Sequence, residues 1–150
     1  MILEFTDSMP GAYRSEPVLI SGPESKGYSN LIFLTLTEGH AITRVFEIKF
    51  DVHCSPFREA LLIDSILAVG HEQYFYLFDI TTHQNILRWA VSGYFGHLYY
   101  DHALFYVADA NGLHCIDTNG EIRWCNRQLA NDGVIVNEFT DQKISGSGDF

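Results

Sequence analysis

Short apolar runs separated by polar turns make up most of this chain. Apolar and polar residues alternate over Ile42–Phe50, as they do in a strand with one buried face. An apolar run at Leu31–Thr37 precedes this segment, and the polar turn Glu38–His40 lies between the two, so the pattern predicts a hairpin within residues 30–58. No segment shows the long 3.6-residue apolar period of a helix. The sequence therefore predicts an all-β protein with little or no helix.

One segment occurs twice, 38 residues apart. Residues 66–79 match residues 104–117 position by position, and each copy continues into a segment that ends in tryptophan, Trp89 in the first and Trp124 in the second. The spacing is 35 residues after the intervening turn, so the length changes only inside that turn. A repeat of this period made of short strands predicts antiparallel, four-stranded, blade-like sheets. The two sheets are expected over residues 59–95 and 96–133.

The remaining segments are less regular. Residues 1–29 contain several glycines, prolines and serines and are expected to be irregular, with a short edge strand at Val18–Ile20. Within residues 134–149, the part from 137 on aligns with residues 97–109 at a spacing of 40, so an incomplete third repeat is expected over 134–150. We interpret the whole chain, residues 1–150, as a single all-β domain.

The segment Asp117–Trp124, which reads Asp-Thr-Asn-Gly-Glu-Ile-Arg-Trp, resembles the repeat of PQQ-like and WD40-like β-propellers. In the PQQ type, an Asp, a turn Gly and a Trp recur in each blade. The resemblance covers residues 60–149 and implies a partial β-propeller, or a propeller-like stack, in which Trp89 and Trp124 pack between neighbouring blades. Closed propellers have four to eight blades. Because this chain is too short for the full ring that the quinone enzymes of the family need, the resemblance does not extend to their activity or cofactor.

Charge limits the classes of partner. Acidic residues outnumber basic residues 19 to 9, which gives a formal net charge of −10. Without a basic patch we expect neither a nucleic acid nor an anionic membrane surface as partner. An acidic surface attracts a basic protein, although it also serves solubility alone.

The cysteines and the N-terminal residues bear on the compartment. Cys54, Cys115 and Cys125 are an odd number at unpatterned spacings, which favours free thiols over a disulfide framework. The first seven residues show no secretory signal, and no apolar run is long enough to span a membrane. We therefore expect a cytoplasmic protein.

Histidines and carboxylates are concentrated in one part of the second repeat, which makes it the candidate region for a metal site. The cluster consists of His97, Asp101, His102, Asp109, His114 and Cys115. Its spacings place no two imidazoles on one face of a strand by a regular period. A metal-dependent hydrolase that uses this region is therefore the weakest hypothesis, and we expect no catalytic residue, cofactor or metal.

Tyrosines are frequent on the predicted strands, and strand alternation turns some of them outward. Exposed tyrosine beside acidic residues is typical of a protein-recognition surface. The expected partner-binding residues are Tyr74, Tyr76, Tyr94, Tyr99, Tyr100, Asp101 and Asp109. The leading hypothesis is a non-enzymatic bacterial immunity or inhibitor protein that neutralises a basic toxin, for example a nuclease, by covering its active site. The competing hypothesis is a fragment or subunit of a larger propeller scaffold, which completes its ring by oligomerisation.

Overall fold

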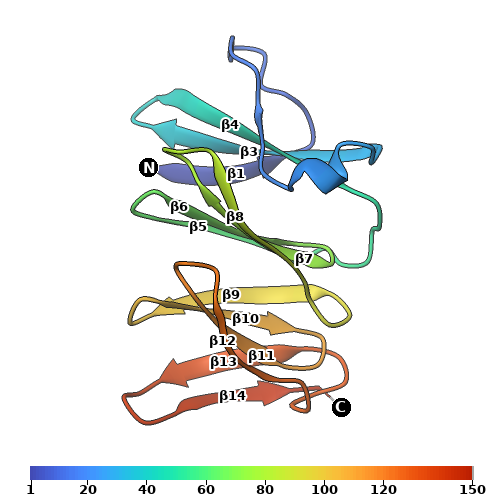
Figure 1. The fold of residues 1–150 in the computed structure, drawn as a ribbon, viewed down its shortest axis with the longest axis vertical. Coiled ribbons are helices and arrows are strands. Elements are labelled where there is room, and N and C mark those ends of the chain that lie inside the picture. Colours follow the sequence, from blue (N-terminus) through green and yellow to red (C-terminus); the bar gives the residue numbers. More distant parts are fainter. Residues whose placement is uncertain (150) are drawn as a thin grey trace. The chain divides into compact units, whose positions relative to one another are not determined.

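The computed structural model describes residues 1–149 of the chain. Their regular structure consists of fourteen strands and one 3-10 helix, η1 at Pro23–Ser25 (Figure 1). The strands form three sheets of four strands and one sheet of two, and each pair of neighbouring strands except β2 and β4 is antiparallel. The predicted all-β class with little helix is therefore confirmed. Among residues 1–149, no helix has the length and apolar character that crossing a membrane requires.

The chain divides into two compact units, one from Met1 to Val52 and one that begins at His53. The first unit is one sheet with the strand order β1-β3-β4-β2. Its strands are β1 (Ile2–Thr6), β2 (Val18–Leu19), β3 (Asn30–Glu38) and β4 (Ala41–Phe50). Strands β3 and β4 are the predicted hairpin, and their turn contains Gly39 at a positive φ of 65°.

The N-terminal segment differs from its expected irregular conformation. Strand β1 pairs antiparallel with β3 along five residue pairs, and β2 adds a short parallel pairing with β4 at the other edge of the sheet. The expected edge strand at Val18–Ile20 is present as β2, whereas β1 was not predicted. Its hydrogen-bond partners come from a strand more than twenty residues away, which a local pattern does not reveal.

The second unit contains the repeat. The first repeat sheet comprises β5 (Arg58–Ile63), β6 (Ile66–His71), β7 (Tyr74–Asp79) and β8 (Gln84–Ala90), and the second comprises β9 (Phe95–Asp101), β10 (Leu104–Asp109), β11 (Leu113–Asp117) and β12 (Ile122–Asn126). The third sheet comprises β13 (Val134–Phe139) and β14 (Ile144–Gly148). In each sheet, neighbouring strands follow one another in sequence.

The strand register confirms the 38-residue repeat over the first three strands. Gly70 lies opposite Phe75 in the first repeat sheet, and Ala108 lies opposite Leu113 at the same place in the second. Both third strands end at an aspartate that holds the turn after it. A carboxylate oxygen of Asp79 accepts hydrogen bonds from two following backbone N–H groups, and Asp117 does the same.

The fourth strands do not continue the repeat as expected. Trp89 lies opposite Phe75, but Trp124 lies opposite Cys115, which is two residues further along the third strand than the equivalent of Phe75. By register, the residue equivalent to Trp89 is Asn126. The sequence comparison paired the two tryptophans with each other. Because the turn between the third and fourth strands changes in length, identical residues in the two copies do not determine the strand register.

The third sheet also shifts against its expected alignment. Asp149 N–H bonds to Gly133 O just as Ala110 N–H bonds to Tyr94 O, so the spacing there is 39 residues and not 40. A shift of one residue exchanges the two faces of a strand. Ile144 consequently packs toward the second repeat sheet, whereas an alignment at 40 would have turned it away.

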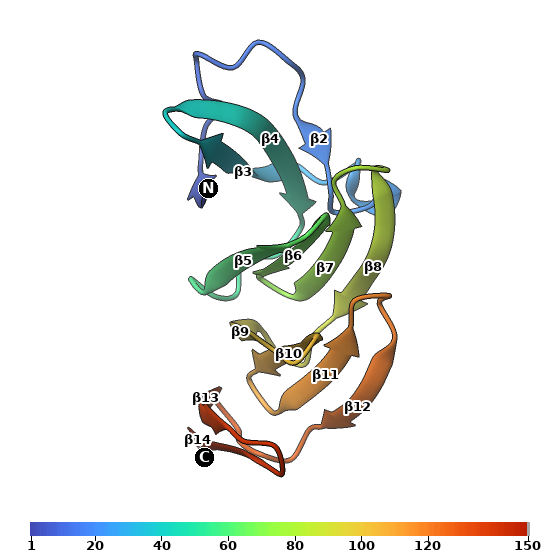
Figure 2. The same ribbon diagram turned by 90° about the vertical axis from the view of Figure 1, so that its left-hand side faces the viewer.

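Apolar residues fill the spaces between successive sheets of this unit. Between the two repeat sheets, the cluster includes Phe75, Leu77, Phe95 and Phe105, all fully buried. Gly70 allows this close approach, because a Cβ atom there would overlap the Phe95 ring. A second cluster joins the second repeat sheet to the third. The third sheet lies against β9 and β10, and Figure 2 shows no described strand at the corresponding place beside β11 and β12.

Candidate binding site

Two of the seven predicted partner-binding residues are buried. The side chain of Tyr76 is 1% exposed and that of Asp109 is 0% exposed, so neither presents a surface to a partner. Both lie in the repeat, where strand alternation does not reveal which face of a sheet is covered by the next sheet. We therefore remove both residues from the candidate binding surface.

The other five are partly exposed but do not form one surface. Tyr99 and Tyr100 are neighbours on β9 and therefore point to opposite faces of its sheet. The Tyr99 hydroxyl accepts a hydrogen bond from Val136 N–H in the third sheet, whereas the Tyr100 ring packs on Phe105 between the repeat sheets. Asp101 pairs with His102 at the end of β9, while Tyr74 lies under Arg88 in the first repeat sheet. Of the five, Tyr94 lines the pocket described below.

The histidine–carboxylate cluster separates into distinct pairs. His102 pairs with Asp101 at 2.8 Å, His114 with Asp109 at 2.7 Å, and His97 with Glu59 at 3.0 Å. Among residues 1–149, no group of three or more His, Cys, Asp or Glu side chains is arranged to hold a metal ion.

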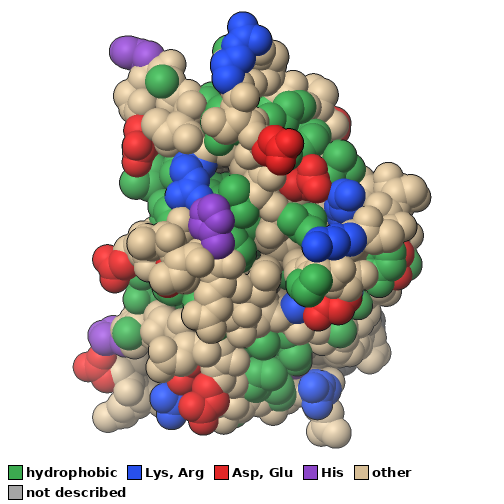
Figure 3. Space-filling model, turned by 45° about the horizontal axis from the view of Figure 1, so that its top comes forward, with side chains coloured by type: hydrophobic (Ala, Val, Ile, Leu, Met, Phe, Trp, Pro, Cys, Tyr) green, Lys and Arg blue, Asp and Glu red, His purple; other side chains and the backbone are tan. Residues whose placement is uncertain are grey.

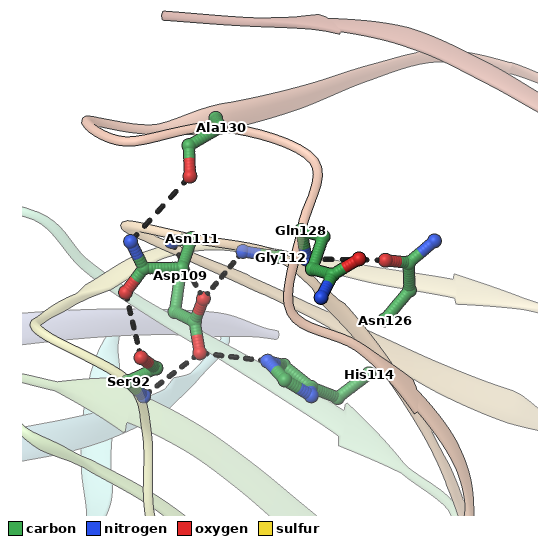
Figure 4. A network of polar contacts seen from close by, with 8 residues as sticks. All are labelled: Ser92, Asp109, Asn111, Gly112, His114, Asn126, Gln128 and Ala130. Carbon is green, nitrogen blue, oxygen red and sulfur yellow. Dashed lines mark hydrogen bonds and ion pairs between the residues drawn. The ribbon is translucent and has the colours of Figure 1, made fainter. Parts of the chain in front are cut away.

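The Asp109–His114 pair anchors the turn between β10 and β11, and Figure 4 shows Asp109 at the centre of the network. One carboxylate oxygen accepts from His114 Nε2 and from Ser92 N–H, and the other accepts from the N–H groups of Asn111 and Gly112. Burial raises the pKa of Asp109, but these hydrogen bonds outweigh the burial and hold the pKa below its ordinary value. The carboxylate is therefore ionised at neutral pH.

This turn holds two connecting segments that border a pocket. Ala110 N–H donates to Tyr94 O on one side and Gly133 N–H donates to Ala110 O on the other. Asn111 O accepts from the N–H groups of Leu129 and Ala130. The buried network thus fixes the segment that carries Tyr94 and the segment that carries Asp132.

The pocket, which we call the acidic pocket, has a volume of about 330 Å³. The residues that line it include Phe57, Tyr94, His97, Asp132 and Asp149. The rings of Phe57 and Tyr94 are stacked with centroids 6.4 Å apart, and the His97 ring lies 5.5 Å from that of Phe57. Aromatic faces beside two carboxylates form a site that suits a cationic group.

The tyrosine in this pocket stays protonated. Its hydroxyl donates to Asp132 Oδ1 at 2.6 Å, and this bond, with burial and the charges of Asp132 and Asp149, raises the pKa of Tyr94 to about 12. The thiol of Cys54 behaves in the same way, because burial and the neighbouring Glu72 raise its pKa to about 11. Neither group supplies an anionic nucleophile at neutral pH.

Sequence reasoning found Tyr94 and considered His97 only as a metal ligand, and it missed Phe57, Asp132 and Asp149. These three residues lie outside the strands, on segments that the fold brings together over distances of up to 92 residues in sequence. Their position before and after the repeat strands is the one signal that could have found them, because connecting segments at the ends of sheets often carry binding residues.

The excess of acidic over basic residues is not evident on every face of the molecule. Figure 3 shows basic and acidic side chains intermixed with hydrophobic ones on the face that it draws. From residue 53 on, however, the sequence holds 12 acidic and 5 basic residues, a net charge of −7.

The sequence matches no protein-family model and no curated protein.

Proposed function

We propose that this protein is a non-enzymatic module that binds a basic protein partner through the acidic pocket. The observation that carries the proposal is the pairing of Asp132 and Asp149 with the aromatic rings of Phe57 and Tyr94 around one hollow. A lysine or arginine side chain fits such a site, since its charge meets the carboxylates while its stem or plane lies on the rings.

The net charge supports the same kind of partner. A net charge of −10 speeds the encounter with a basic protein and disfavours an acidic one. In its specific form, the proposal is a cytoplasmic immunity protein whose partner is a basic toxin, with a lysine or arginine of the toxin's active site in the pocket. An equimolar amount of the protein should then abolish the activity of that toxin.

The test compares cationic and anionic probes at the pocket. Short peptides with a central lysine or arginine should shift the NMR signals of Tyr94 and His97, and peptides with a central glutamate should not. The double variant Asp132→Asn/Asp149→Asn should lose these shifts. Both carboxylate charges are removed in this variant, while the amide oxygen introduced at position 132 can still accept the Tyr94 hydroxyl.

A matched control is Asp141→Asn, which removes an exposed carboxylate from the turn between β13 and β14. It should leave the lysine-dependent shifts unchanged. Equal shifts with lysine and glutamate peptides, or unchanged shifts in the double variant, would refute the proposal. Raising the salt concentration should weaken the binding, because both charges are exposed to solvent.

A further inference from the structure

A carboxylate–imidazole pair lies at the wall of the acidic pocket. His97 Nδ1 and Glu59 Oε1 are 3.0 Å apart, and Glu59 Oε2 accepts a hydrogen bond from Leu98 N–H at 3.2 Å. Glu59 belongs to β5 in the first repeat sheet, whereas His97 and Leu98 belong to β9 in the second. Both oxygens of this carboxylate are therefore engaged with one edge of β9.

The two ring nitrogens of His97 face different surroundings. His97 lines the acidic pocket, but Glu59 is not among the residues that line it. The rings of Phe57 and Tyr99 lie beside the imidazole, with centroids 5.5 Å and 6.3 Å from its own. With Nδ1 turned toward Glu59, Nε2 lies on the side of the ring away from this carboxylate.

The carboxylate decides which nitrogen carries the proton. An ionised carboxylate has acceptors only, so a neutral imidazole that bonds to Glu59 must donate from Nδ1. A neutral imidazole has one N–H and one lone pair, which leaves the lone pair on Nε2. With its proton held in this way, His97 presents an acceptor to the pocket without adding a charge.

The acceptors of the acidic pocket lie beside its aromatic rings. Asp132 accepts from the Tyr94 hydroxyl at 2.6 Å. His97 lies against Phe57, whose ring is stacked with that of Tyr94. A lysine ammonium is a compact charge whose three donors leave one atom, whereas a guanidinium spreads five N–H donors over a plane that stacks on aromatic rings. A carboxylate and an imidazole nitrogen beside aromatic faces therefore suit a guanidinium better than an ammonium.

We propose that the acidic pocket selects arginine over lysine and that His97, positioned by Glu59, makes this choice. Glu59 holds the imidazole proton on Nδ1, and Nε2 accepts an N–H of the guanidinium while Asp132 meets its charge. His97 contacts the occupant, whereas Glu59 acts through His97 and is a positioning residue. The inference rests on the proposed function, because it names the cation that the pocket takes.

Paired peptides measure the selection. Two short peptides that differ only in a central arginine or lysine are titrated into the protein, and the NMR signals of Tyr94 give the two dissociation constants. The arginine peptide should bind about tenfold more tightly, which corresponds to one hydrogen bond to a charged donor. Equal affinities would overturn the selection of arginine and leave the proposed function standing. If neither peptide binds, the proposed function is wrong and the selection falls with it.

Glu59→Gln tests the positioning role without changing the shape of the side chain. The amide oxygen should keep the bond from Leu98 N–H, so the amide NH2 group faces His97 Nδ1 and donates to it. The imidazole proton then moves to Nε2, and the acceptor of the pocket becomes a donor. Nitrogen NMR of the imidazole at about pH 8 should show the proton on Nδ1 in the parent protein and on Nε2 in the variant. The preference for arginine should disappear, whereas loss of charge alone would weaken both peptides.

Glu121→Gln is the matched control for this variant. It removes the same charge from an exposed turn at the opposite end of the second repeat sheet, and it should keep both the imidazole proton on Nδ1 and the preference for arginine. Urea unfolding checks that both variants stay folded. A parent protein with its imidazole proton on Nε2, or with both nitrogens protonated, would overturn the role of Glu59. So would a Glu59→Gln variant with an unchanged preference.

The pH dependence of binding separates His97 from a merely structural role. A second proton on the imidazole removes the Nε2 acceptor and adds a positive charge, so the affinity for the arginine peptide should fall from about pH 8 to about pH 5.5. The other titratable groups near the imidazole come from β5, β9 and the connecting segments, and they are Glu59, Tyr94, Tyr99, Asp132 and Asp149.

His97→Asn assigns this pH dependence. The variant keeps an amide donor for Glu59 but has no group in the place of Nε2. It should bind the arginine and lysine peptides alike and lose most of the dependence on pH. An unchanged pH profile would assign the dependence to the carboxylates of the pocket and overturn the acceptor role of His97.

The bare cations distinguish a protein partner from a small molecule. Methylguanidinium and methylammonium present the same charge without a peptide chain, and the first should shift the Tyr94 signals more. The arginine peptide should bind more tightly than methylguanidinium, because the stem of the side chain also lies on the aromatic rings. Equal affinities for these two would keep the selection of a guanidinium but remove the protein partner of the proposed function.

Discussion

The two repeat sheets have the same number of strands and the same register over their first three strands, yet their outer faces differ. On the first repeat sheet, the following sheet covers the face that carries Trp89, and His114 lies against that ring. On the second, the third sheet lies against β9 and β10, Leu113 and Cys115 of β11 are buried in the same cluster, and Trp124 of β12 is 41% exposed. The same local pattern is buried in one copy and partly exposed in the other. Among residues 1–149, the next sheet has four strands in the first case and two in the second.

A second difference lies at the turn after the second strand of each sheet. His71 and Asp109 are equivalent by the 38-residue spacing, and both are buried. In the first repeat sheet the adjacent Glu72 accepts from the N–H groups of Cys54 and Ser55, and in the second Asp109 itself accepts from Ser92 N–H. Both carboxylates hold the segment that leads into the first strand of their own sheet. The anchoring role is kept although the residue that performs it has moved by one position.

The largest loss of stability is expected when the carboxylate of Asp109 is removed. Asp109→Ala removes four accepted hydrogen bonds and leaves the buried His114 without its partner, so it should lower the free energy of unfolding by about 3–5 kcal/mol. Urea unfolding measures this change. Glu138→Ala, which removes an exposed carboxylate from β13, should change the stability by less than about 0.5 kcal/mol. Equal effects for the two variants would show that the Asp109 network does not hold the turn.

The two tryptophans should differ next. Trp89→Ala should destabilise the protein by about 2–4 kcal/mol, since its ring packs between two sheets. Trp124→Ala should cost about 1 kcal/mol or less, because a large part of its ring already contacts water. The propeller resemblance, which implies that both tryptophans pack between blades, would instead predict a large loss for Trp124→Ala as well. Parallel thermal and urea unfolding of the two variants decides between these expectations.

The pH dependence of stability should then distinguish the contribution of His71 from that of Asp109. Burial, helped by the nearby Arg58 and His53, outweighs the opposing charge of Glu72 and lowers the pKa of His71 to about 4. The unfolded chain binds a proton at this histidine below about pH 6.5 and the folded chain does not, so stability falls as the pH drops from about 6.5 to 4. The expected loss is roughly 2–3 kcal/mol, and His71→Gln should remove this part of the slope.

The pKa of Asp109 is also lowered in the folded state, but this has its effect at a lower pH. Its contribution is present above the ordinary carboxyl pKa and is lost as the pH falls further. His40→Gln, which changes an exposed histidine in the first unit, is the control and should keep the slope. If His71→Gln has the same pH dependence as the parent protein, His71 is not the group that titrates.

The smallest effect concerns the spacing between the sheets. Gly70→Ala places a Cβ against the Phe95 ring and should destabilise the protein by about 1–3 kcal/mol. Its equivalent Ala108 already carries a Cβ atom within the cluster that joins the second repeat sheet to the third. Ala108→Gly should therefore cost about 0.5–1 kcal/mol, mainly through backbone entropy. Urea unfolding curves of both variants measure these changes. A Gly70→Ala variant as stable as the parent protein would contradict the close approach of the Phe95 ring.

The amino-acid sequence determined the strand content, the hairpin of the first unit and the repeat of the second. These features depend on local alternation, on turn residues such as Asp79 and Asp117, and on similarity between segments, all of which can be read along the chain. The register of the later strands was not fixed in this way. The fourth strand is shifted by two residues and the third sheet by one, because turn lengths change and hydrogen bonds settle the pairing only when both strands are present.

Which side chains are buried was decided by the tertiary structure alone. Tyr76 and Asp109 have the residue types of a binding surface but are covered, whereas Trp124 has that of a core residue and is exposed. The acidic pocket joins Phe57, Tyr94 and Asp149, which no local pattern connects. Burial depends on what packs on the other face of a sheet, and that neighbour lies tens of residues away in the chain. The sequence set the strands of this protein, and the stacking of its sheets set which of their faces remain available for binding.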